Sequence, residues 1–271
     1  MSSTPIVKIN DLTFNYPVSD PIFKNFDLTV NAGEFIALLG SNGSGKSTLS
    51  RLIVGLVDEE NITEGVIEKN GKVSMVFQNP ERQFVGATVE DDIAFGLENL
   101  KIPTEQMPTI IDNALKMVDM QDYKERPVEN LSGGQQQRVA IASTVVLNPN
   151  LIIFDEATSM LDPEGREQIL DLIKQLRKNN KDLAVIMITH NMDEASESSR
   201  TIILNNGKIV ADEKTDNILN DIKLLEKNNL QLTTVNQFKN ELNKASVKLP
   251  KNIQESSSIN KITAWLSSSN K

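Results

Sequence analysis

Two patterns of apolar residues predict two kinds of strand. Residues 12–16 and 26–30 alternate apolar with polar side chains, as antiparallel strands with one exposed face do. Three other runs are apolar throughout, which indicates strands covered on both faces: residues 35–39, 151–154 and 184–188. The sequence therefore predicts an α/β protein that combines an antiparallel β-subdomain with a buried sheet.

A helix is predicted between the last two buried strands. Asp162 is a natural N-cap, Pro163 suits the first helical turn, and one face is apolar through Ile169, Ile173 and Leu176. The order strand, helix, strand implies that the two strands are parallel.

Helical patterns dominate two further regions. Residues 80–150 form a predicted helical subdomain, with helices near 110–120 and 135–147. We expect a main domain over residues 1–211, followed over residues 212–271 by a C-terminal helical domain that is a candidate for dimerisation. Three helices are expected there, marked by the apolar positions Ile218, Ile222 and Leu225, then Val235, Phe238 and Leu242, then Ile259, Ile262, Trp265 and Leu266.

Composition excludes several classes of function. The 271 residues carry a net charge of -9, and a nucleic-acid binder would need clustered Lys and Arg. The longest apolar runs are far shorter than the roughly 20 residues that span a bilayer, so a membrane connection is expected to run through a partner. There is no secretion signal and no cysteine, which fits a cytoplasmic protein.

A glycine-rich loop follows the strand at 35–39 and precedes periodic apolar residues. Its pattern is G-x-x-x-x-G-K-[ST], in which backbone N–H groups converge on a phosphate at a helix N-terminus. Lys46 would contact the β- and γ-phosphates, and Ser47 would offer an oxygen to magnesium. The loop consists of Gly40, Ser41, Asn42, Gly43, Ser44, Gly45, Lys46, Ser47 and Thr48.

Two adjacent acids follow the strand at 151–154. Adjacent carboxylates resist burial unless a cation or a proton relieves their repulsion. We expect Asp155 to face the magnesium through a bound water. Glu156 is then the candidate that polarises the water attacking the γ-phosphate.

A second candidate phosphate site begins at Ser132. Ser132 and Gln135 have the spacing of a capping box, which leaves Gly133 and Gly134 unexplained. Bare N–H groups at a helix N-terminus suit a phosphate. Because 86 residues separate Lys46 from Ser132, two copies packed head to tail would let each chain complete the other's site.

In their order along the chain, these motifs resemble those of an ATP-binding-cassette (ABC) ATPase over residues 6–210. The resemblance implies ATP and Mg²⁺ as cofactors and makes residues 40–48 the Walker A loop. Its remaining assignments are Tyr16 stacking on adenine, Gln78 as the Q-loop glutamine and a magnesium ligand, Ser132, Gly133, Gly134 and Gln135 as the signature acting in trans, Asp155 and Glu156 as the Walker B pair, Asp162 in the D-loop, also in trans, and His190 as the switch histidine.

Residues 78–99 and the run DEATSMLDPEGR resemble more closely the A component of energy-coupling-factor (ECF) transporters, which import vitamins and transition-metal ions. The ATSMLDP form resembles the first of two ATPase paralogues. This resemblance implies three partners: the second paralogue in a head-to-tail dimer, a transmembrane T component and a substrate-binding membrane S component. It also implies a peripheral location on the cytoplasmic face of the cell membrane.

The sequence argues against two other classes of function. A soluble ABC-type ATPase of DNA repair would place a long coiled coil between Walker A and signature, and one of translation would carry two cassettes. A regulatory subunit without catalysis would lack the base or the switch residue, yet Glu156 and His190 are both present.

Overall fold

The computed structural model describes residues 4–245, 247, 249–250, 262, 265 and 267. Its centre is a six-stranded sheet in the order β5-β6-β7-β3-β8-β9, parallel except for the antiparallel pair β8 and β9. The strands are β3 (Phe35–Leu39), β5 (Val73–Val76), β6 (Leu151–Asp155), β7 (Ala184–Ile188), β8 (Arg200–Asn205) and β9 (Lys208–Lys214). The predicted parallel pairing of the strands at 151–154 and 184–188 is confirmed.

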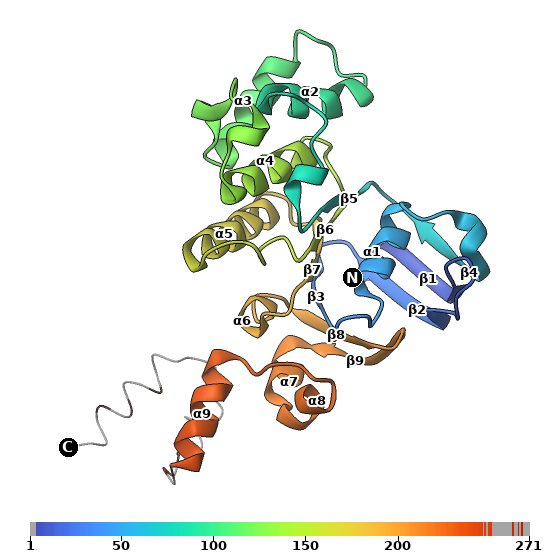
Figure 1. Ribbon diagram of the computed structural model, residues 1–271, viewed down its shortest axis with the longest axis vertical. Coiled ribbons are helices and arrows are strands. Elements are labelled where there is room, and N and C mark those ends of the chain that lie inside the picture. The colour runs from blue at the N-terminus through green and yellow to red at the C-terminus, as the bar shows by residue number, and fades with distance from the viewer. Residues whose placement is uncertain are drawn as a thin grey trace.

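A second, antiparallel sheet lies beside the first (Figure 1). It has the order β2-β1-β4, with β1 (Pro5–Phe14), β2 (Phe23–Asn31) and β4 (Ile62–Lys69). The alternating residues 12–16 and 26–30 fall on β1, the residues just after it, and β2, which confirms the predicted antiparallel strands. The 3-10 turn η1 (Glu59–Asn61) leads into β4.

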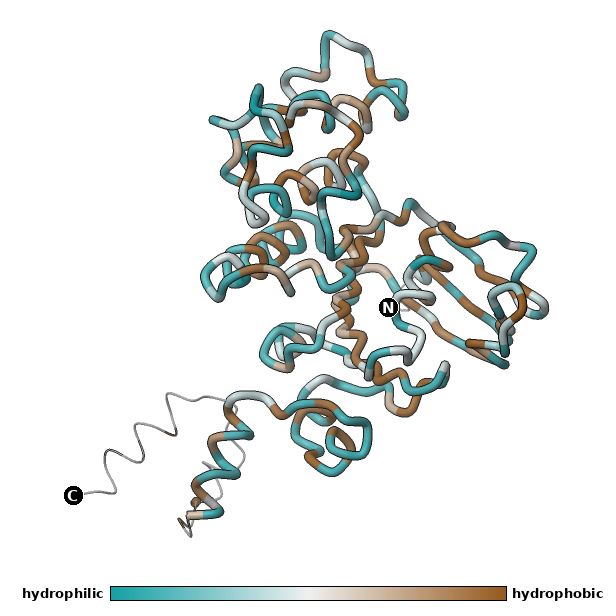
Figure 2. Tube along the Cα trace, in the orientation of Figure 1, coloured by the Kyte–Doolittle hydropathy of each residue, from teal (hydrophilic) through white to brown (hydrophobic). Residues whose placement is uncertain are grey.

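The central strands β3, β6 and β7 are buried on both faces and are hydrophobic along most of their length (Figure 2). On β6, Ile152 and Phe154 pack with the helical layer, whereas Leu151 and Ile153 pack with the antiparallel sheet and with α1 (Lys46–Val54). Successive residues of a strand point to opposite faces, so a strand covered twice must be apolar at every position.

The helical subdomain stacks above the sheet in Figure 1. It comprises α2 (Val89–Asn99), α3 (Met107–Met117) and α4 (Gly133–Val145), with short 3-10 turns η2 (Pro80–Arg82), η3 (Gln121–Tyr123) and η4 (Val128–Asn130) between them. The helix α5 (Pro163–Asn179) joins β6 to β7 and begins at the predicted cap, where Asp162 Oδ1 accepts a hydrogen bond from Gly165 N at 2.9 Å.

The C-terminal part departs from prediction at its first helix. Two helices stand there, α7 (Thr215–Asn220) and α8 (Ile222–Lys227), instead of one. Asp221 breaks the run with ψ of 83°, and its Oδ1 caps α8 by accepting from Leu224 N at 3.0 Å. Asp competes for backbone N–H groups in this way and favours caps over helix interiors.

The remaining helices are α6 (Met192–Ala195) and α9 (Thr234–Lys244), the latter as predicted. Of the third predicted C-terminal helix, Ile262 and Trp265 are helical, while Ile259 and Leu266 lie outside the described residues. The helices α7 and α8 pack on β3 and β8, whereas the apolar face of α9 joins a separate small cluster with Leu249, Ile262 and Trp265.

No helix within the described ranges is long and apolar enough to cross a bilayer.

Replacing Ile153 by Ala should lower the free energy of unfolding by about 2–5 kcal/mol, because it removes three carbons from a fully buried position and leaves a cavity. Chemical denaturation measures the loss. The matched control is Val66→Ala on β4, where the side chain is 47% exposed and the change should stay within about 0.5 kcal/mol. Equal losses at both positions would contradict the assignment of β6 to the core.

Candidate active site

The loop after β3 has the backbone that a phosphate requires. Gly40 lies so close to β8 that an added Cβ would sit 2.2 Å from the carbonyl oxygen of Leu204. Gly45 precedes α1 at a φ of 107°, in the left-handed region, and no side chain caps the helix. The first N–H groups of α1 are therefore left bare for a ligand.

Lys46 is buried beneath this loop. Its Nζ donates to the carbonyl oxygens of Gly40 at 2.8 Å and Ser41 at 3.1 Å. Burial lowers the pKa of the Lys46 ammonium, while the charges of Glu156 and Asp155 act in the opposite direction. The ammonium thus occupies the concave side of the loop and is bonded to the loop's own backbone.

Asp155 ends β6 opposite the loop and is 9% exposed. Ser47 Oγ lies 3.5 Å from its Oδ1, at the limit of a hydrogen bond. Burial raises the pKa of the Asp155 carboxyl and the charge of Glu156 raises it further, against the effects of Ser47, Arg51 and Lys46. This carboxylate is therefore destabilised in the protein alone, and a cation placed beside it would relieve the cost.

Glu156 turns away from its neighbour because its backbone is left-handed, with φ of 51°. Its Oε1 lies 3.0 Å from His190 Nε2, and its Oε2 accepts from Gln78 Nε2 at 3.3 Å. Gln78 Nε2 also lies 3.2 Å from Ser159 Oγ. The structure thus brings together Gln78, Glu156 and His190 from three separate loops.

Ser132 caps α4 as predicted. Its side chain accepts from Gln135 N at 3.4 Å, and Ser132 N donates to Gln135 Oε1 at 2.9 Å. An added Cβ would meet nothing within 4 Å at Gly133 and only Leu161 Cδ2, at 3.7 Å, at Gly134. Packing within the chain therefore does not require these two glycines, and the backbone beside them is open.

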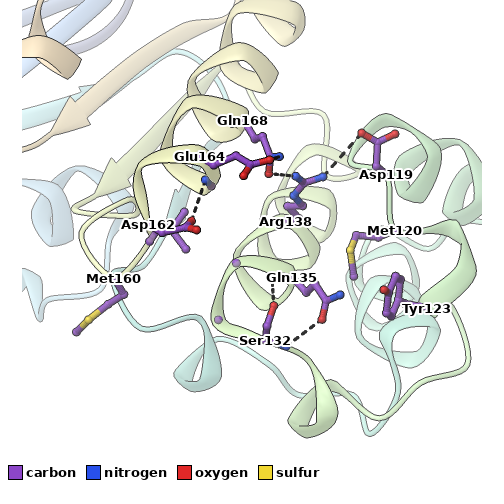
Figure 3. Close-up of a pocket in the computed structure, with 14 residues that line it drawn as sticks. Asp119, Met120, Tyr123, Ser132, Gln135, Arg138, Met160, Asp162, Glu164 and Gln168 are labelled. Carbon is purple, nitrogen blue, oxygen red and sulfur yellow. Dashed lines mark hydrogen bonds and ion pairs between the residues drawn. The ribbon is translucent and has the colours of Figure 1, made fainter.

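The signature residues line a cleft of about 550 Å³ between α4 and the start of α5 (Figure 3). Asp162 and Gln168 lie on the α5 side of the cleft. Arg138 and Asp119 also line it, with 3.8 Å between Arg138 Nη1 and Asp119 Oδ2. No residue of the loop 40–48 lines this cleft, so the structure does not join the signature to the phosphate loop.

Tyr16 follows β1 and is half-buried. Its ring packs edge-on against Phe14, with 5.1 Å between centroids, and it contacts the core below the antiparallel sheet. Residues 17–20, which follow Tyr16 in the chain, are exposed.

Oxygen atoms dominate the place where a metal would bind. Ser47 and Asp155 offer a hydroxyl and a carboxylate, the hard ligands that Mg²⁺ prefers, and Mg²⁺ completes its shell with waters and substrate phosphates. Among the described residues, no group of three or more His, Cys, Asp or Glu is placed to hold a metal ion.

Several polar residues beside the site were missed by sequence reasoning. Thr158, Thr189 and Glu194 are buried, with Glu194 only 2% exposed, and Arg166, whose side chain is 31% exposed, pairs with Glu194. A lone Glu within a polar helix looks like a surface residue, and only its contacts with other loops show otherwise.

The fold and this loop define an ATPase of the ABC class: residues 23–159 match the family model "ABC transporter". The chain is 43% identical to the energy-coupling factor transporter ATP-binding protein EcfA1 of Leuconostoc mesenteroides, over 98% of each chain. It belongs to this family of energy-coupling factor ATP-binding proteins, which confirms the sequence-based prediction.

Two solved structures share the fold. The ATPase cbiO1 of Clostridium perfringens, part of an ABC transporter complex, is 29% identical with a TM-score of 0.74, over 88% of this chain and 99% of that one. An ATP-binding cassette solved as a dimer in a post-hydrolysis state with ADP and Pi is 28% identical with a TM-score of 0.68, over 77% and 98%. The predicted α/β class with an antiparallel sheet and a helical subdomain is confirmed.

In metal-free protein, Asp155→Asn should raise the melting temperature at pH 7. The raised pKa of Asp155 means that the folded state binds this proton more tightly than the unfolded state, so stability falls as pH rises through the folded value. The advantage of Asn should therefore disappear below about pH 4, where both states are protonated.

Thermal melts in the presence of a chelator, at pH 7 and below about pH 4, measure this effect. Asp20→Asn, at an exposed position, is the matched control and should change neither melt. A lower melting temperature for Asp155→Asn at pH 7 would contradict the electrostatic assignment.

Proposed function

We propose that this chain hydrolyses ATP with Mg²⁺ at residues 40–48, 155 and 156. The observation that carries the proposal is the Glu156 carboxylate, held 3.0 Å from His190 and 3.3 Å from Gln78 beside the phosphate loop. A carboxylate so placed is a candidate base for a water that attacks the γ-phosphate.

Each residue has a separate part in this proposal. The uncapped N–H groups at the start of α1 would cradle the phosphates, and Lys46 would exchange its two backbone carbonyls for phosphate oxygens. Ser47, Gln78 and Asp155 would hold Mg²⁺, Asp155 through a water, and the bound ion would supply neutralisation of the charge on the β- and γ-phosphates. Tyr16 supplies an aromatic face to adenine.

Around the reacting water, Glu156 accepts the proton, and His190 orients Glu156 and contacts the γ-phosphate. Gln78 hydrogen-bonds the same carboxylate from the other side, so it restrains the rotamer of Glu156. Gln78 also lies 3.2 Å from Ser159 Oγ, and it stands between β5 and η2, in the segment that leads from the sheet to the helical subdomain.

Glu156→Gln should keep nucleotide affinity within about twofold and lower steady-state hydrolysis by about 10²–10⁴-fold, because the amide preserves shape but cannot accept a proton. Phosphate release by the assembled complex, with ATP binding measured in parallel, tests both parts. Glu226→Gln, an exposed change on α8 away from the site, is the control. If the complex keeps near-parental turnover when every site able to hydrolyse ATP lacks this carboxylate, the role of Glu156 as the base is refuted.

We propose further that catalysis requires a second ATPase chain, most simply the second paralogue of an energy-coupling factor, packed head to tail. Ser132, Gly133, Gly134, Gln135 and Asp162 would then act in trans on the partner's nucleotide. The outward-facing cleft around them supports this arrangement, because it contains no residue of this chain's own phosphate loop.

Ser132→Arg should leave ATP binding at this chain's own loop unchanged and abolish hydrolysis at the partner's site, since the bulky side chain enters the cleft that receives the partner's γ-phosphate. Complexes with one altered chain at a time assign the loss. Ser132→Thr, which keeps the capping oxygen, is the matched control. Damage confined to the altered chain's own site would contradict the head-to-tail arrangement.

The membrane partners of the proposed transporter are a transmembrane T component and a substrate-binding S component, with vitamins or transition-metal ions as cargo. The name of the Leuconostoc relative and the complex that contains cbiO1 support this. The chain would be peripheral, on the cytoplasmic face of the cell membrane.

The T component has a candidate docking place. A groove between β5 and α2 exposes Phe95 at 44% and Val85 at 65%, next to the segment that carries Gln78. An apolar groove of this kind suits the apolar face of an amphipathic helix.

We also propose the division into a nucleotide-binding domain, residues 1–211 with a helical subdomain at about 80–150, and a C-terminal helical domain, residues 212–271, as a dimerisation element. The separate cluster around α9 supports a distinct C-terminal element, while the strand β9 runs to residue 214 and so crosses the proposed boundary. The helices α7 and α8, which pack on the main sheet, would connect the two parts.

A further inference from the structure

A buried carboxylate outside the phosphate site joins two of its loops. Glu194, on α6, is 2% exposed. It accepts hydrogen bonds from Thr158 Oγ1 at 2.8 Å and Thr189 Oγ1 at 2.5 Å, and Arg166 Nε lies 3.1 Å from its Oε1. A buried charge persists only when such partners compensate for the lost hydration.

The partners of Glu194 flank the residues that contact each other in the candidate active site. Thr158 stands two residues after Glu156, and Thr189 directly precedes His190. The carboxylate of Glu194 therefore ties together the two short segments whose side chains meet at 3.0 Å.

Further hydrogen bonds fix the segment that carries His190. Thr189 Oγ1 donates to Glu194 and accepts from Asn191 N at 2.9 Å, so both sides of its hydroxyl are engaged around His190. On the other side, Glu156 N donates to the carbonyl oxygen of Ile188 at 3.0 Å. Strand pairing alone aligns β6 with β7 only as far as Asp155 and Ile188, and the polar group continues the alignment beyond the strand ends.

A role in stability alone would be met by the ion pair between the buried Glu194 and Arg166, whose side chain is 31% exposed. Such a role needs only that pair, and it gives no reason for two threonine hydroxyls, from two different loops, to converge on the same carboxylate. The convergence fixes the separation of the loops, and a displacement of about 1 Å at reacting groups can lower a rate about 10²-fold.

We propose that Glu194 is a positioning residue that sets the distance between Glu156 and His190 through the hydroxyls of Thr158 and Thr189. The inference rests on the proposed roles of Glu156 and His190. Because the group does not contact residues 40–48, its loss should lower kcat and leave KM for ATP nearly unchanged.

The test uses isosteric pairs in the assembled, membrane-reconstituted complex. Thr189→Val keeps shape and removes the hydroxyl, whereas Thr189→Ser keeps the hydroxyl; Thr158→Val and Thr158→Ser form the second pair. We expect each Val variant to lower kcat about 10- to 100-fold, with KM for ATP within about twofold. The Ser variants should stay within about threefold of the parent. Glu194→Gln should behave like the Val variants.

Melting curves verify that each variant is folded at the assay temperature, and Glu156→Gln in the same assay separates two kinds of failure. If Glu156→Gln is inactive and the Val variants keep parental kcat, the positioning role is wrong while the proposed function stands. If Glu156→Gln remains active, the proposed role of Glu156 as the base is wrong. Equal losses in Ser and Val variants, or a rise in KM that matches the fall in kcat, would also overturn the inference.

Discussion

The site depends on the placement of two adjacent carboxylates at the end of a buried strand. Asp155 and Glu156 repel each other, and burial of Asp155 adds to the cost. The left-handed backbone at Glu156 separates them, so that one carboxylate faces Ser47 and Lys46 while the other faces His190 and Gln78. Two chemical roles thus arise from neighbouring residues because the chain turns sharply between them.

The phosphate loop concentrates positive charge and unpaired N–H groups opposite these carboxylates. Lys46 is desolvated and bonded only to carbonyl oxygens of its own loop, and the N–H groups at the start of α1 have no capping side chain. A magnesium nucleotide, as proposed above, would relieve both the buried cation with its bare amides and the destabilised carboxylate opposite them. Electrostatic cost of this kind is common at functional sites.

The sequence was sufficient to predict elements whose signal is local. The apolar strands β3, β6 and β7, the cap at Asp162 and the glycine-rich loop are determined by neighbouring residues, so the fold class and most candidate site residues could be predicted. The break at Asp221 was missed, because Asp can stand in a helix or cap one, and packing of α7 and α8 on the sheet decides between these. The Glu194 group was missed because its members lie on three segments that only the tertiary fold brings together.

The central claim is that each catalytic site needs two chains, and a disulfide cross-link tests it most directly. The chain has no cysteine, and Gly133 has open space for a side chain, so Gly133→Cys supplies a single thiol beside α4. With a partner ATPase carrying one cysteine in its phosphate loop, mild oxidation should give a covalent heterodimer in the presence of ATP and little without it. No cross-link between ATP-bound, folded chains, or an intrachain link formed equally fast when Asn42→Cys is added to the same chain, would contradict the account.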